Sequence, residues 1–193
     1  MKNLEVRKKI IGAAVRVFTQ RGFFETRVED IARCAGIAKG TVYLYFKDKP
    51  SLYAGIIDEY FNGAVTMLKQ TVSENISPTR KLEKIAKDWV RFMLRFKGGI
   101  GLEMIDNMNL TSRIMKAIHR QAIARVDEIV ALISRIISEG VEKGEFRKTD
   151  PRIGAYFFLN AVRAAFSLHF FIPAVAGKEQ EIIRITLDGL KRR

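Results

Sequence analysis

The sequence predicts an all-α protein of about nine helices, with three in an N-terminal head and six in a larger body. Apolar residues recur with helical spacing almost everywhere outside the turns, and no alternating or hairpin pattern indicates a strand. A helix-turn-helix pattern within 22–52 also separates a small head from the remainder. We therefore predict a helix-turn-helix domain over 1–48 and a second, larger helical domain over 49–193.

The head is expected to begin with a helix over about 3–20, which ends at Gly22. Thr26 and Glu29 then have the spacing of a capping box. In such a box the Thr26 hydroxyl accepts a hydrogen bond from the Glu29 amide, and the Glu29 carboxylate accepts one from the Thr26 amide. This pattern predicts the start of a second helix.

The turn between the two motif helices is predicted at Gly36, because a sharp turn requires a positive φ that glycine adopts freely. The helix before the turn buries Val28 and Ile31, and the helix after it buries Val42 and Phe46. That second helix is about two turns long and is not stable alone. Its inner face must pack, which leaves its outer face free for another role.

The segment closely resembles the DNA-binding domain of the tetracycline-repressor (TetR) family over about residues 8–55. The residues that fall on the family's pattern are Gly22, Phe23, Thr26, Ile31, Ala32, Ala35, Gly36, Ile37, Gly40, Thr41, Tyr43, Tyr45, Phe46, Lys47 and Lys49. Two positions depart from it. Arg27 stands where the family usually has a threonine or serine, and Pro50 stands where it favours glutamate. If Asp48 is an N-cap, Pro50 lies in the first helical turn, where proline is tolerated.

The resemblance implies which residues meet DNA. Those expected in the major groove are Lys39, Gly40, Thr41, Tyr43 and Leu44, with Leu44 against thymine methyl groups and Lys39 donating to guanine. Those expected at phosphates are Thr26, Arg27, Thr41, Tyr45 and Lys49.

The charge distribution agrees with a nucleic-acid partner. The formal net charge is +13, and residues 1–50 hold eleven lysines and arginines against five aspartates and glutamates, giving +6. Residues 51–193 hold 23 against 16, giving +7 over nearly three times the length. Basic density is therefore highest where the helix-turn-helix lies. Because many basic residues only solubilise a protein, charge alone is weak support.

The body is predicted to contain helices over about 49–72, 78–97, 103–109, 112–143, 151–171 and 179–191. Ser77-Pro78 and Asp150-Pro151 each combine an N-cap residue with a proline at the first helical position.

The helix over 151–171 is apolar on nearly all sides and must be buried on all sides. In a body of this size such a helix favours a partner chain, and a central core helix that needs no partner is the alternative. The resemblance implies a two-fold interface formed by the last two helices. The predicted interface residues are Phe158, Val162, Phe166, Phe170, Ile183 and Leu187.

A stripe of aromatic residues and methionines is the candidate effector pocket. Its members, with one polar partner, are Trp89, Phe92, Met93, Phe96, Met104, Met108 and Arg163. Such residues suit an adaptable apolar cavity, although on residue types alone a stripe of this kind more often forms plain core. The resemblance favours the pocket, because it implies that the domain over 49–193 binds an effector and forms the dimer. The other polar candidates, Asp106, His119 and His169, form no cluster in the sequence.

Other classes of protein find little support. The chain has no nucleophile-elbow, zinc-protease, P-loop or dinucleotide motif, so we expect no enzyme activity, no cofactor and no metal. Cys34 is the single cysteine, which excludes an intramolecular disulfide. No run approaches the roughly 20 apolar residues of a membrane span, and no signal peptide is recognisable, so we expect a cytoplasmic protein with no membrane partner.

The sequence thus predicts a homodimeric transcriptional repressor of TetR type. Its expected partners are double-stranded DNA with an inverted-repeat operator and a small apolar or amphipathic effector. Two alternatives remain open: an architectural DNA-binding protein without an effector, and a ligand-binding body whose head contacts protein.

Overall fold

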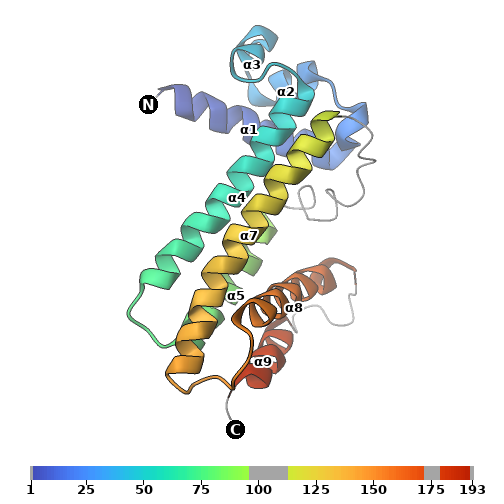
Figure 1. Ribbon diagram of the computed structural model, residues 1–193. Coiled ribbons are helices and arrows are strands. Elements are labelled where there is room, and N and C mark those ends of the chain that lie inside the picture. The colour runs from blue at the N-terminus through green and yellow to red at the C-terminus, as the bar shows by residue number, and fades with distance from the viewer. Residues whose placement is uncertain (1, 96–112, 172–178, 192–193) are drawn as a thin grey trace. The chain divides into compact units, whose positions relative to one another are not determined.

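The computed structural model describes residues 2–95, 113–171 and 179–191, with side chains over 3–89, 91–92, 123–165 and 180–191. Eight helices account for nearly all of these residues, and only an isolated bridge between Phe146 and Lys191 has extended pairing (Figure 1). The predicted all-α class is confirmed, and the predicted helix near 103–109 lies outside the described residues. No helix among them combines the length and apolarity needed to cross a bilayer.

The chain divides into two compact units, Met1–Phe61 with Phe96–Ile123, and Asn62–Arg95 with Ala124–Arg193. The first unit contains α1 (Lys2–Glu25), α2 (Val28–Ala35), α3 (Lys39–Tyr45) and the start of α4 (Lys49–Ser73). The second contains the rest of α4, α5 (Pro78–Arg95), most of α7 (Arg113–Glu142), α8 (Pro151–Phe171) and α9 (Glu179–Leu190). The predicted boundary at residue 48 remains a prediction.

The turn between α2 and α3 is as predicted. Gly36 has φ 61° and ψ 43°, in the left-handed region that glycine adopts at low cost. Its amide donates to Arg33 O at 3.1 Å, and the Ile37 amide donates to Ala32 O at 3.1 Å, which together close the end of α2. Val28, Ile31, Val42 and Phe46 are all buried, as expected.

The capping box predicted for Thr26 and Glu29 is wrong. The N-cap of α2 is Arg27, and its amide donates to Asp30 Oδ2 at 3.3 Å. Both residues lie one position later in the chain than the predicted pair. Gly22 has non-helical backbone angles, φ 77° and ψ 165°, which free its carbonyl. The buried Thr26 hydroxyl donates to that carbonyl at 2.6 Å. The kink at Gly22 therefore takes the hydroxyl away from the helix start.

The predicted caps of three later helices are confirmed. At α4, the Ser51 amide donates to Asp48 Oδ1 at 2.7 Å. At α5, the Arg80 amide donates to Ser77 Oγ at 3.3 Å. At α8, the amide of Ile153 donates to Asp150 Oδ1 at 2.9 Å. Pro50 therefore lies in the first turn of α4, where proline is tolerated.

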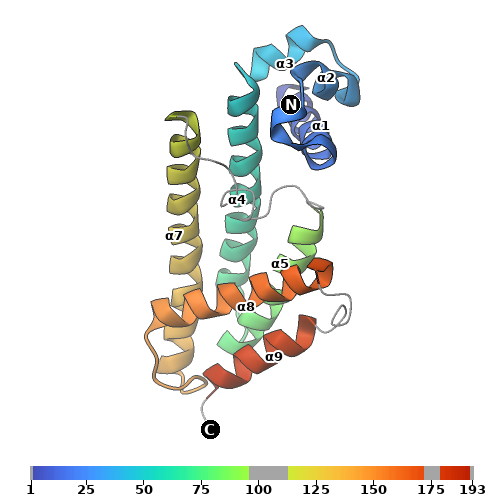
Figure 2. The ribbon, with the colours of Figure 1, turned by 90° about the vertical axis from the view of Figure 1, so that its right-hand side faces the viewer.

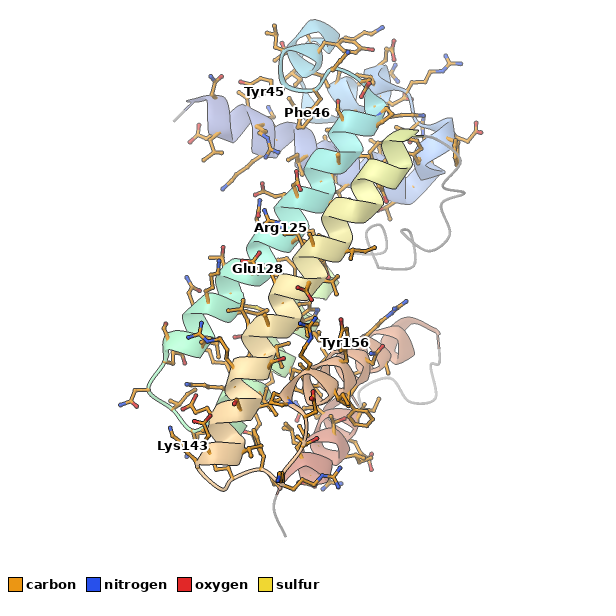
Figure 3. All side chains as sticks on the ribbon, in the orientation of Figure 1. Tyr45, Phe46, Arg125, Glu128, Lys143 and Tyr156 are labelled. Carbon is orange, nitrogen blue, oxygen red and sulfur yellow. The ribbon has the colours of Figure 1, made fainter. Side chains whose placement is uncertain are left out.

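In the second unit, α8 packs against α9 and α5 (Figure 2). The later part of α4 is joined to α7 by an ion pair between Lys69 and Glu128 at 2.9 Å, and Arg125 also contacts Glu128 at 3.0 Å (Figure 3). Lys81 on α5 is buried and pairs with Glu139 on α7 at 2.9 Å. Hydrogen bonds from Lys143 and Lys81 hold the pKa of Glu139 below its usual value.

Candidate nucleic-acid interface

The outer face of α3 is the best-formed candidate site in the first unit. Val42 points inward and is 1% exposed, whereas Leu44 is 84% exposed and Tyr43 is 44% exposed. Gly40 is also exposed, and the spacing of positions 40, 43 and 44 places all three on one face of the helix. A large apolar side chain that is almost fully exposed on so short a helix indicates a surface that binds something.

Gly40 is not required by the fold. It has no positive φ, and a Cβ added there would meet no atom within 4 Å. Glycine nevertheless weakens a helix by about 1 kcal/mol relative to alanine. Gly40 therefore destabilises α3, and nothing in the packing or backbone conformation of the helix requires a glycine there. A glycine of this kind is expected where the backbone of another molecule must approach closely.

Lys39 lies at the start of α3 and forms an ion pair with Glu29 of α2. This hydrogen bond lowers the pKa of Glu29 and raises the pKa of Lys39. The Lys39 ammonium also lies 5.7 Å from the centre of the Tyr43 ring. Both ionic groups are about half exposed, so Lys39 can exchange Glu29 for a DNA acceptor at low cost.

The residues predicted to contact phosphates on α2 and α3 differ in how exposed they are. Arg27 is exposed, as a phosphate ligand must be, and Thr41 is half-buried on α3. Thr26 is 1% exposed, and its hydroxyl hydrogen is already donated to Gly22 O. The direct phosphate role predicted for Thr26 is therefore wrong, because a buried donor does not reach DNA.

Lys49 has a structural role that the sequence did not predict. Its ammonium donates to Phe23 O at 2.7 Å, Thr26 O at 2.9 Å and Phe24 O at 3.0 Å. It also lies 4.7 Å from the centre of the Phe23 ring. An ammonium has three hydrogens, and all three are used. Burial lowers the pKa of Lys49, and the negative charge of Glu25 acts in the opposite direction. Lys49 thus fastens the start of α4 to the end of α1. A phosphate contact would have to replace one of these bonds, so the contact predicted for Lys49 remains a prediction.

Tyr45 donates its hydroxyl hydrogen to Asn3 Oδ1 at 2.6 Å, which joins the end of α3 to the first turn of α1. Sequence reasoning missed Asn3, because nothing local marks a partner 42 residues away. Arg21, Arg33 and Lys47 are among the exposed cations of the first unit that the predicted site also left out. Arg21 and Arg33 lie 3.4 and 3.8 Å from Asp30.

The family models match both parts of the chain. The model "Bacterial regulatory proteins, tetR family" matches residues 10–56, and the model "Tetracyclin repressor-like, C-terminal domain" matches residues 75–167. The chain belongs to the TetR family. It is therefore a DNA-binding transcriptional regulator, and the resemblance seen in the sequence is confirmed.

Known proteins agree with this assignment. The fatty acid metabolism regulator protein of Bacillus subtilis (strain 168) is 26% identical over 144 residues, which cover 72% of this chain and 70% of that protein. The crystal structure of Bacillus subtilis FadR in complex with stearoyl-CoA aligns with a TM-score of 0.76 at 19% identity, covering 95% of this chain and 98% of that one. The structure of AibR in complex with isovaleryl coenzyme A and operator DNA aligns at 0.71 and 20% identity, covering 96% and 98%.

The predicted dimer residues of this TetR-family regulator lie inside its own fold where the structure describes them. Phe158, Val162, Ile183 and Leu187 are at most 8% exposed in the single chain, so they are not free to meet a partner. Side chains of Phe166 and Phe170 lie outside the described residues. Among the described side chains of α8 and α9, the large apolar ones that are exposed are instead Ile153, Tyr156, Phe157 and Ile185.

The predicted effector residues are described only in part. Trp89 is buried, and Phe92 packs so closely on Gly63 that a Cβ there would lie 3.0 Å from the ring. Arg163 is half-buried. The side chains of Met93, Phe96, Met104, Met108, Asp106, His119 and His169 lie outside the described residues. This pocket therefore remains a prediction.

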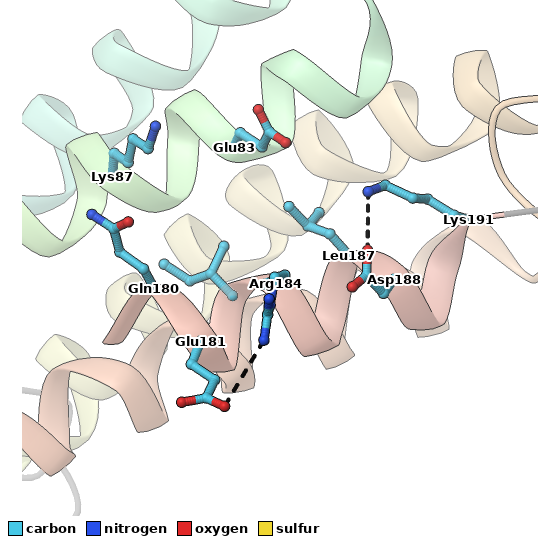
Figure 4. A pocket seen from close by; sticks show the side chains of 9 residues that line it. Glu83, Lys87, Gln180, Glu181, Arg184, Leu187, Asp188 and Lys191 are labelled. Atoms are coloured by element: carbon cyan, nitrogen blue, oxygen red, sulfur yellow. Dashed lines mark hydrogen bonds and ion pairs between the residues drawn. The ribbon is translucent and has the colours of Figure 1, made fainter. Parts of the chain in front are cut away.

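A different cleft, of about 480 Å³, lies between α5 and α9 (Figure 4). Its floor is Ile183 and Leu187, and charged groups of both signs surround them. Arg184 pairs with Glu181 at 3.9 Å and Lys191 with Asp188 at 3.0 Å on the α9 side. Mixed charge around a small apolar floor favours no single class of ligand.

Proposed function

We propose that this regulator is a homodimeric repressor that binds an inverted-repeat operator and is released by a small amphipathic effector. The outer face of α3 carries the operator part of the proposal. It presents an exposed leucine and tyrosine beside a glycine that the fold does not need. Thymine methyl groups in the major groove offer an apolar partner to such a face. An architectural protein that coats DNA binds through phosphates and does not require an exposed apolar face on α3.

Two substitutions on this face test sequence-specific binding. Leu44→Ala is expected to weaken operator binding about tenfold, the effect of losing one base contact, while binding to unrelated DNA stays near wild type. Gly40→Ala is expected to stabilise α3 and still weaken operator binding, because the added methyl group blocks close approach. Fluorescence anisotropy with operator and scrambled DNA, together with thermal melts, measures both effects.

The control for Leu44→Ala is Ile123→Ala, which shortens an exposed apolar side chain of α7. It should bind operator as the wild type does. If Leu44→Ala weakens operator and scrambled DNA by the same factor, α3 does not read bases, and the coating alternative is favoured.

The dimer is proposed through the exposed apolar face of α8 and α9. Ile153 and Phe157 lie four residues apart on α8 and are 68% and 62% exposed, and Ile185 on α9 is 63% exposed. Apolar side chains exposed at this spacing on one helix mark an interaction surface, and we propose that Ile185 belongs to the same surface. A two-fold pairing places two α3 helices on two half-sites, which accounts for an inverted repeat.

The proposed effector is an acyl-CoA thioester, an apolar chain on a polar carrier. Two observations support this class. The relatives with described complexes contain stearoyl-CoA and isovaleryl coenzyme A. In this chain, Trp89 is buried and Phe92 half-buried on the apolar stripe of α5. Aromatic walls of this kind accept an acyl chain.

Trp89 is the only tryptophan, so its fluorescence reports on the proposed pocket alone. In a panel of stearoyl-CoA, isovaleryl-CoA, stearate and free CoA, at least one thioester should change Trp89 emission and lower operator affinity about tenfold. Such a loss requires about 1.4 kcal/mol of coupling. By linkage, operator DNA should weaken binding of the same thioester by the same factor.

The control is Trp89→Phe, which removes the signal and should keep release from operator DNA. A thioester that changes Trp89 emission while the two affinities remain independent fills the pocket without acting as a switch. That result contradicts the effector proposal and leaves the operator proposal intact.

A further inference from the structure

The hydroxyl of Tyr45 has a single hydrogen, and that hydrogen is donated to Asn3 Oδ1 at 2.6 Å. Tyr45 is the last residue of α3 and is half-buried on the side that faces α1 (Figure 3). While this bond stands, Tyr45 has no donor left for a phosphate. The predicted phosphate contact at Tyr45 therefore needs another donor.

Asn3 supplies that donor. Its carbonyl oxygen is held by Tyr45, so its orientation is fixed and its amide nitrogen, with two hydrogens, points away from the bond. The side chain is exposed, and no acceptor for this nitrogen is found among the residues that the structure describes. Neutral amides of this kind are common phosphate ligands in protein–DNA complexes.

Asn3 and Tyr45 line a groove next to the outer face of α3. The groove, of about 640 Å³, is lined by Asn3, Leu4, Arg7, Leu44 and Tyr45. Leu44 belongs to both surfaces, and Leu4 on the opposite wall is 57% exposed. A helix in the major groove is flanked by the sugar–phosphate backbone, so a groove beside the outer face of α3 lies where a backbone passes.

Arg7 adds a guanidinium to the wall of the groove. Its guanidinium is held in place by Glu59 at 3.2 Å and lies 5.5 Å from the centre of the Phe46 ring. About a third of its side chain remains exposed. The wall therefore combines a fixed cation with a neutral amide donor, which suits a phosphodiester.

We propose that this groove receives the operator's sugar–phosphate backbone, with the Asn3 amide as the phosphate ligand and Tyr45 as the residue that positions it. The inference rests on the proposed DNA-binding role of α3 and extends the interface to the first turn of α1. A phosphate contact contributes affinity without sequence preference. Changes at Asn3 should therefore affect all DNA alike.

The test is Asn3→Asp in the full-length protein. Aspartate keeps the acceptor for Tyr45, removes both donors and places a negative charge against phosphate. It is favourable in the first turn of a helix, so α1 should not unfold. We expect binding to weaken at least tenfold on operator and scrambled DNA, with an unchanged ratio between them. Asn62→Asp, an exposed position of the second unit, makes the same charge change and should bind as the wild type does.

A double-mutant cycle tests the positioning role. Asn3→Ala and Tyr45→Phe should each weaken binding about fivefold, and the double variant should lose no more than either single one. Wild-type binding by Asn3→Asp, or a loss in Tyr45→Phe without one in Asn3→Ala, would overturn the proposal. If the wild type does not prefer its operator over scrambled DNA, the proposed function fails. The proposal for Asn3 can still be tested in that case, because the effect of Asn3→Asp is measurable on scrambled DNA alone.

Discussion

Replacing Lys49 by methionine is expected to lower the free energy of unfolding by about 3 kcal/mol. Methionine keeps an unbranched apolar side chain and removes the ammonium, with its three donors and its contact with the Phe23 ring. The carbonyls of Phe23, Phe24 and Thr26, which accept at 2.7 to 3.0 Å, then lose their partner. The chain between α1 and α2 should loosen, and operator binding should weaken because the start of α2 is no longer fixed. Chemical denaturation and anisotropy measure the two effects.

Lys47→Met is the matched control, because Lys47 is exposed and lies two residues away. The charge change is the same, but unfolding free energy should stay within about 0.5 kcal/mol of wild type. The salt dependence of DNA binding separates the two roles further. Lys49→Met should leave the slope of log affinity against log salt unchanged, since no phosphate contact is removed. Wild-type stability with a slope reduced by about one would instead make Lys49 a phosphate ligand.

The correct predictions from the sequence rest on local chemistry. Gly36 lies where the turn requires a left-handed residue, and Asp48, Ser77 and Asp150 cap helices whose first amides are two or three residues away. Such signals are complete within a few positions of the chain. The order of helices follows from these signals and from apolar periodicity.

The errors and omissions arise where a side chain binds a partner far away in the sequence, or where a nearby group competes for the same hydrogen bond. Lys49 binds carbonyls about 25 residues earlier, and no pattern around Lys49 indicates them. Thr26 and Glu29 have the spacing of a capping box, but the kink at Gly22 offers the hydroxyl a carbonyl, and Lys39 offers the carboxylate a cation. Asn3 carries no signal apart from its type.

The dimer residues show a further limit. Phe157 and Phe158 are neighbouring residues of the same type, yet Phe157 is 62% exposed and Phe158 is 1% exposed. A helix that is apolar on nearly all sides does not reveal which side its own chain covers. Only the packing of α8 on α5 and α9 decides this, and it assigns Phe158 to the interior.

Phe157→Glu is expected to give a folded monomer. In the single chain a carboxylate at this exposed position is hydrated and costs little, whereas in the proposed interface it is buried without a partner. Sedimentation velocity at micromolar concentration should show dimers for the wild type and monomers for the variant. Operator affinity should fall about 100-fold, because two linked heads gain affinity from binding together. Affinity for DNA with one half-site should not change.

Two controls identify the face. Phe158→Glu, one residue later, places the carboxylate in the chain's own core and should give unfolded or insoluble protein. Ile123→Glu changes an exposed apolar residue of α7 and should remain dimeric with wild-type operator affinity. If Phe157→Glu stays dimeric, this face of α8 is not the interface. If it is monomeric but loses half-site affinity equally, the change has damaged the head, and the loss does not report on pairing. Monomers with intact half-site binding would make the exposed face of α8 the element that sets the spacing of the two α3 helices on the operator.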